Sequence, residues 1–116
     1  MDSNHQYCIS IPLNIDDLDN IPEGVLWEDI KFDDFYLSKS DYDNLLKLFC
    51  QFDKPFDVII DEYEEEIIPA SRIQTAIEMT ERFANKASPT VKKSAEKLLI
   101  AFKRAKELHK QILFSF

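Results

Sequence analysis

The chain has 116 residues, of which 45% are hydrophobic and only one is glycine, and its formal net charge is −8. This length and apolar content predict a single globular domain over residues 1–116 and exclude a disordered chain. The lone glycine excludes glycine-rich phosphate loops and the nucleophile elbow of hydrolases, because each of those motifs needs at least two glycines.

The N-terminal residues and the cysteines predict a cytoplasmic protein. Met1–His5 is polar and acidic, without the basic and apolar regions of a secretory signal. No run approaches the ~20 apolar residues of a membrane span, so we expect no membrane contact. Cys8 and Cys50 are isolated in the sequence, which predicts two reduced thiols rather than a disulfide.

The first third of the chain predicts a strand, a loop and a segment of mixed character. Apolar residues alternate with other residues from Tyr7 to Ile15, which predicts a half-buried strand, and Pro12 predicts that it lies at a sheet edge or near its own end. Residues 16–24 are rich in turn-forming residues and predict a loop. Residues 25–37 alternate only weakly and predict a strand joined to irregular structure.

The central part predicts a helix followed by a short strand. Ser38 and Asp41 have the spacing of a helix N-cap and its capping box, and apolar residues then recur at three- and four-residue intervals. Pro55 predicts the end of this helix. The β-branched run at 56–60 predicts a strand, and residues 61–66 carry five acids around one tyrosine.

The next element is predicted to be a second amphipathic helix. Pro69 suits a first helical position, and Ser71 with Gln74 resembles a capping box. Glu78 and Arg82 have the i,i+4 spacing of a favourable ion pair.

A third helix and a last strand complete the predicted architecture. Ser88 is the expected N-cap of this helix, with Pro89 at the first helical position. Residues 112–116 are apolar apart from one serine and predict a C-terminal strand. The order of elements predicts an α+β fold, with three main amphipathic helices packed on a small sheet that includes an N-terminal and a C-terminal strand.

No motif predicts catalysis, a cofactor or a metal site. His5 and Cys8 have the spacing of half a zinc site, but a structural zinc site needs a second close pair, and Cys50 and His109 are each alone. Most carboxylates lie in runs, whereas a catalytic acid needs desolvation or a like-charged neighbour in a cleft. We therefore expect a protein that is not an enzyme and that needs no cofactor.

The acidic residues are concentrated in one part of the chain. Residues 1–66 hold 18 of the 22 acidic residues and 4 of the 14 lysines and arginines, which leaves a net −14 there and +6 in residues 67–116. A partition of this size predicts a negative surface that attracts a positively charged partner.

The basic residues of the last predicted helix have three possible roles. They are Lys92, Lys93, Lys97, Lys103, Arg104, Lys106 and Lys110. This set could contact phosphates, form an ordinary solvated helix face, or tether part of the acidic half within the molecule. The overall negative charge disfavours direct binding of nucleic acid.

Aromatic residues interleaved with acids predict a partner-binding surface in two segments. Interface hot spots are often aromatic anchors within a polar surround. The candidate residues are Trp27, Glu28, Asp29, Asp33, Asp34, Tyr36, Asp61, Glu62, Tyr63, Glu64, Glu65 and Glu66. The alternative is that the aromatic residues belong to the core and the acids to a solvated rim.

Three features of the chain resemble small bacterial immunity proteins of toxin–immunity pairs, in particular those of contact-dependent growth inhibition systems. They are the segment Tyr63–Pro69 leading into a helix, the helix entry Tyr36–Ser38, and the apolar end Ile112–Phe116. The resemblance implies a cytoplasmic protein that binds one toxin domain tightly, often a nuclease with a basic cleft. We expect this protein to be a monomer or weak dimer.

Two other functions remain open at the level of the sequence. An acidic mimic of nucleic acid, or a regulatory adaptor, would bind a host DNA-binding protein through the same negative surface. An enzyme or metal protein would require a cleft that holds a carboxylate pair with perturbed pKa values.

Overall fold

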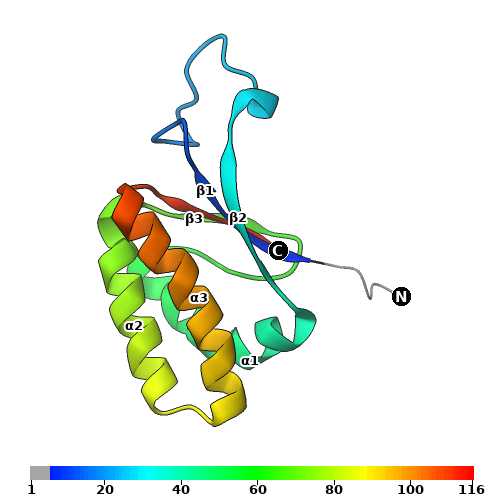
Figure 1. Cartoon of the computed structure of the whole chain (residues 1–116), viewed down its shortest axis with the longest axis vertical. Helices are drawn as coiled ribbons and strands as arrows, with labels where there is room; N and C mark the ends of the chain where they lie inside the picture. Colours follow the sequence, from blue (N-terminus) through cyan, green and yellow to red (C-terminus); the bar gives the residue numbers. More distant parts are fainter. Residues whose placement is uncertain (1–5) are drawn as a thin grey trace.

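Three helices pack on one side of a four-stranded antiparallel sheet in the structure, a computed structural model that describes residues 6–116 (Figure 1). The strands are β1 (Tyr7–Pro12), β2 (Phe32–Leu37), β3 (Glu65–Ile68) and β4 (Ile112–Ser115). The helices are α1 (Lys39–Phe56), α2 (Ile73–Asn85) and α3 (Pro89–Leu108). The sheet order is β2-β1-β4-β3, so the predicted α+β fold with an N-terminal and a C-terminal strand is confirmed.

Strand β1 lies in the interior of the sheet and ends at its proline. Tyr7 and Ile9 point toward the helices and are fully buried, as the alternating pattern predicts. The strand stops at Pro12 rather than at Ile15, because proline has no N–H for the ladder. Of the two positions that Pro12 predicts, the strand end is right and the sheet edge is wrong.

Helix α1 begins with the predicted capping box and extends beyond its predicted end. The Ser38 hydroxyl accepts a hydrogen bond from the Asp41 N–H, and the Asp41 carboxylate accepts one from the Ser38 N–H, each at 3.0 Å. Pro55 lies inside the last turn, where only one further residue follows it, and Asp57 caps the helix in the left-handed region at φ 54°. The prediction that Pro55 ends the helix was therefore wrong by one residue.

The strand predicted at residues 56–60 is absent, and a strand forms at Glu65–Ile68 instead. Val58 and Ile60 are buried in the core, but this segment joins no ladder of the described sheet. Strand β3 forms where Ile67 and Ile68 pair with β4. Pairing with β4 outweighs the local β-propensity of the earlier run.

Helix α2 starts differently from its prediction, whereas α3 starts as predicted. Ser71 lies in a 3-10 turn, and α2 begins at Ile73 without a side-chain cap. Glu78 accepts a 3.4 Å hydrogen bond from Gln74, and no ion pair joins it to Arg82. At α3, the Ser88 hydroxyl accepts the Val91 N–H, and proline occupies the first helical position.

A small second core holds the loop of residues 13–31 against the far side of the sheet. Leu18 and Ile30 pack on Leu113, which points away from the helices. The Gln111 side chain accepts the Leu18 N–H at 2.6 Å, so the loop is fixed to the residue directly before β4. No helix within residues 6–116 is long and apolar enough to cross a membrane.

Candidate protein-binding surface

The side of the sheet that faces away from the helices presents one row of four residues. The strand registers pair Tyr36 with Cys8, Cys8 with Ser115, and Ser115 with Glu65. Residues paired across a ladder share a face, so Tyr36 and Glu65 lie about 14 Å apart at the two ends of the row. Together with exposed Asp34 this row forms what we call the open face, whereas Ser10, the partner of Asp34 on β1, is buried.

Asp34 is an exposed acid of the open face. It lies beside Ser10, whose hydroxyl donates a 2.6 Å hydrogen bond to its carboxylate, and no described lysine or arginine forms an ion pair with it. Burial raises the pKa of the Cys8 thiol, so this group stays protonated and is a weak nucleophile. Nearby Cys8 and Asp34 raise the pKa of Tyr36. The open face therefore offers an acid and a neutral phenol, which suit contact with a cationic partner.

The loop just before the start of β2 adds the second predicted group. Trp27, Glu28 and Asp29 form a 3-10 turn in which the indole is 53% exposed and its ring lies 5.4 Å from that of Phe32. The Asp29 carboxylate accepts the Leu26 N–H at 3.1 Å.

The sequence interpretation missed two exposed apolar neighbours of this turn, Val25 and Leu26. The available signal is the run of three large apolar residues directly after the turn at Gly24. Three consecutive side chains directly after a tight turn cannot all point into the same core.

Several predicted site residues lie elsewhere and make structural contacts. Asp33 points to the helix side of β2 and pairs with Arg104 of α3 at 3.2 Å. Glu66 also faces the helix side, by its register with Phe114. The structure therefore does not bring these two acids to the open face. Tyr63 and Glu64 occupy the turn before β3, where the Tyr63 N–H donates to the Phe116 carbonyl at 2.6 Å.

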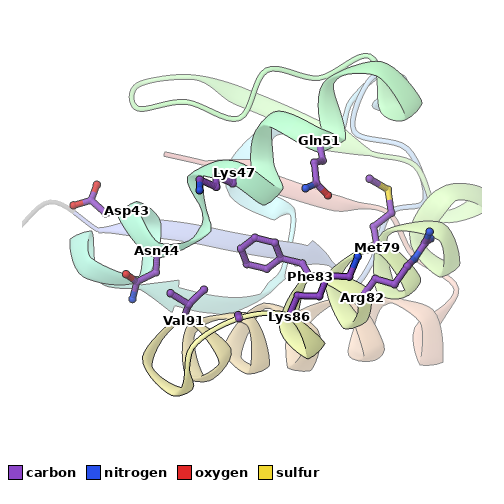
Figure 2. Close-up of a pocket in the computed structure, with 10 residues that line it drawn as sticks. Asp43, Asn44, Lys47, Gln51, Met79, Arg82, Phe83, Lys86 and Val91 are labelled. Carbon is purple, nitrogen blue, oxygen red and sulfur yellow. The ribbon is translucent and has the colours of Figure 1, made fainter.

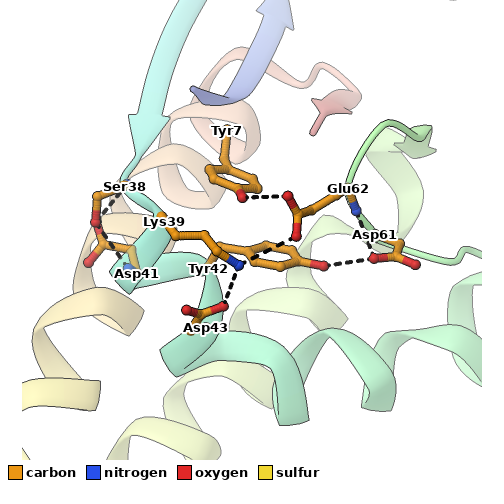
Figure 3. Close-up of polar contacts among 8 residues, drawn as sticks. All are labelled: Tyr7, Ser38, Lys39, Asp41, Tyr42, Asp43, Asp61 and Glu62. Atoms are coloured by element: carbon orange, nitrogen blue, oxygen red, sulfur yellow. Dashed lines mark hydrogen bonds and ion pairs between the residues drawn. The ribbon is translucent and has the colours of Figure 1, made fainter. Parts of the chain in front are cut away.

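Asp61 and Glu62 contact a pair of stacked tyrosines (Figure 3). The rings of Tyr7 and Tyr42 lie 4.6 Å apart, Tyr7 donates to Glu62, and Tyr42 donates to Asp61, each hydrogen bond being 2.9 Å long. Lys39 lies between Glu62 and an acid of its own helix and pairs with both. These contacts hold the 61–62 segment against α1 and β1.

The buried hydroxyls of these two tyrosines are expected to ionise only at high pH. Burial, followed by the hydrogen bonds to Glu62 and Asp61, raises the pKa of Tyr7 and of Tyr42 to about 12. These values exceed the ordinary value of 10.0. The protonated hydroxyls therefore contribute fully to the free energy of unfolding below pH 10, and this contribution is lost as the pH rises toward about 12. A rapid-mixing titration of tyrosine absorbance should show two tyrosines that ionise only near pH 12. Tyr7→Phe should remove one of these ionisations, and Tyr7→Phe/Tyr42→Phe should remove both. Ionisation of all four tyrosines together near pH 10 would contradict this assignment.

Three of the seven basic residues make the contacts that the intramolecular tether predicts, whereas Lys92, Lys93 and Lys106 are exposed and form no ion pair with a described residue. Lys97 pairs with Asp41 at 2.7 Å, and Arg104 pairs with Asp33 at 3.2 Å. Lys110, just after the helix, pairs with Asp16. Cations of the second half of the chain thus neutralise acids of the first half on the helix side and at the loop.

The described residues contain no group of three or more His, Cys, Asp or Glu side chains that could hold a metal ion. His5, considered above as half of a zinc site, lies outside residues 6–116. Comparison with protein-family models, curated proteins and solved structures finds no match to this chain.

Proposed function

We propose that this protein is a non-enzymatic, cytoplasmic immunity protein that binds one cognate bacterial toxin through the open face and the adjoining 25–29 turn. The toxin that fits this surface is a basic domain, and a nuclease is the leading candidate because its substrate is a polyanion. The immunity protein acts as a monomer or weak dimer.

One observation supports the proposal above the others: two exposed acids without an ion pair to a described residue, Asp34 and Glu65, lie on the side of the sheet opposite the helices. Asp33 and Asp41 are paired with cations of α3, whereas Asp34 and Glu65 have no ion pair within residues 6–116. Tyr36, 54% exposed, lies on the same face. An exposed aromatic with one acid beside it on the same strand and a second acid across the face provides both an anchor and charge complementarity for a basic partner.

The test is capture of partners from a lysate of the source cells with the tagged protein, at low and at high salt. The wild type is expected to retain one basic protein that is toxic alone and is silenced by this chain. The variant Asp34→Lys/Glu65→Lys should lose at least about tenfold in affinity for it, since each reversal replaces attraction with repulsion. Thermal unfolding of the variant would check that the fold is intact.

A charge-matched control distinguishes an effect at the open face from an effect of the protein's changed net charge. Asp53→Lys/Glu96→Lys makes the same change at two exposed helix positions that have no described ion pair. This variant should keep near-wild-type affinity. Equal loss in both variants would contradict a role for the open face. Capture of many DNA-binding proteins, all released by salt, would instead indicate a nucleic-acid mimic.

A further inference from the structure

A groove of about 590 Å³ lies between α1 and α2, next to the start of α3 (Figure 2). Its position on the helix side makes it independent of the open face. We propose that this groove binds a small organic anion that has an apolar body and one carboxylate or phosphate group. The volume is in the range of small-molecule sites, which combine an apolar lining with a few placed polar groups.

The floor of the groove is apolar and rests on the main core. Met79 and Phe83 of α2 are partly buried and pack against that core, so their positions are fixed by it. Figure 2 shows the Phe83 ring pointing between the two helices. Val91, half-buried at the start of α3, completes the apolar lining. An aromatic or aliphatic group placed here would cover surface that now faces water.

Three cations border this floor and none is neutralised. Lys47 comes from α1, and Arg82 and Lys86 come from α2 and its C-terminal cap. None of them forms an ion pair with a residue in the part of the chain that the structure describes. The acid at the groove, Asp43, is already paired with Lys39 at 3.0 Å.

This local excess of positive charge stands out in a chain of net charge −8. By contrast, Lys97 and Arg104 of α3 are paired with acids of the first half. An arginine and two lysines left without acids beside an apolar floor favour an anionic ligand, because a guanidinium can bind a carboxylate or phosphate with two parallel hydrogen bonds. Two side-chain amides also line the groove, those of Asn44 and Gln51.

The test is an NMR titration of the full ¹⁵N-labelled chain with phenyl phosphate and, separately, with benzoate. We expect saturable amide shifts centred on Gln51, Phe83 and Lys86 with at least one of these probes. Inorganic phosphate lacks the apolar body and phenol lacks the charge, so each should bind at least about tenfold more weakly. The relative strength of phenyl phosphate and benzoate identifies the preferred anion.

Matched variants test the charge requirement without disturbing the core. Arg82→Gln/Lys86→Gln should weaken binding about tenfold, in line with the loss of charge-assisted contacts. Lys93→Gln/Lys106→Gln removes the same charge from exposed positions of α3 outside the groove and should leave binding unchanged. Three results would each overturn the proposal: no saturable shift through the millimolar range, equal binding of phenol, or equal weakening in both variants.

Discussion

Replacement of Phe49 by alanine is expected to lower the free energy of unfolding by about 3 to 5 kcal/mol. Phe49 is 2% exposed and projects from α1 into the main core. Its ring lies within 6.2 Å of four other aromatic rings, those of Tyr42, Phe52, Phe114 and Phe116. Removal of the ring leaves a cavity between a helix and the interior strand β4, and neighbours that touch one another on all sides cannot collapse fully into it.

Urea unfolding followed by circular dichroism would measure this loss. Leu46→Ala is the matched control, because Leu46 lies on the same helix and is 40% exposed. The control should cost less than about 1 kcal/mol. If the two variants lost the same stability, the aromatic cluster would not be the centre of the core.

Replacement of Asp41 by alanine is expected to cost about 2 to 3 kcal/mol, the second largest effect. Asp41 is 7% exposed and joins α1 to α3. Its carboxylate accepts hydrogen bonds from Lys97 and Ser94, both at 2.7 Å, and from the Ser38 N–H at 3.0 Å. The substitution leaves the buried Ser94 hydroxyl without this acceptor and removes half of the α1 capping box.

The same residue predicts a specific acid sensitivity. Burial alone would raise the pKa of Asp41, but the hydrogen bonds from Lys97, Ser94 and Ser38 outweigh it and lower the pKa from 3.8 to about 2. The pKa of Asp41 is lower in the folded state than in the unfolded state. Its carboxylate therefore contributes fully to the free energy of unfolding above pH 3.8, and this contribution is lost as the pH falls toward about 2. A shift of this size corresponds to about 2 kcal/mol at neutral pH.

Urea unfolding between pH 2 and pH 6 would reveal this dependence. The difference in stability between wild type and Asp41→Asn should shrink as the pH falls below about 4. Asp43→Asn is the control, since Asp43 pairs with Lys39 on the surface of the same helix. Its effect should stay within about 1 kcal/mol throughout. A pH-independent difference for Asp41→Asn would contradict the proposed linkage.

The elements predicted correctly from the sequence are those whose signals are local. The Ser38 box and the Ser88 cap each act within one helical turn, and the alternation from Tyr7 depends only on a strand's own geometry. The error at 56–60 has a different origin. Strand formation there depends on the partner that β4 provides about 50 residues later, which neither segment encodes by itself.

The candidate surface was predicted in part for a related reason. Consecutive residues of a strand face opposite sides, so Asp33 and Asp34 separate as soon as β2 is defined as Phe32–Leu37. The sequence pattern predicts a strand joined to irregular structure in this segment but does not give the ends of the strand. Both acids are therefore predicted to lie on one surface. The contacts of Asp61 and Glu62 with two tyrosines required the tertiary fold.

The row from Tyr36 through Cys8 and Ser115 to Glu65 takes one residue from each strand, and those residues are far apart along the chain. Contacts between segments so distant in sequence tend to form slowly, whereas the adjacent helices α2 and α3 need only a short loop to meet. The complete row exists only once β4 lies between β1 and β3. A partner that needs both ends of the row would discriminate between finished molecules and folding intermediates, and nascent or damaged chains would not compete for it.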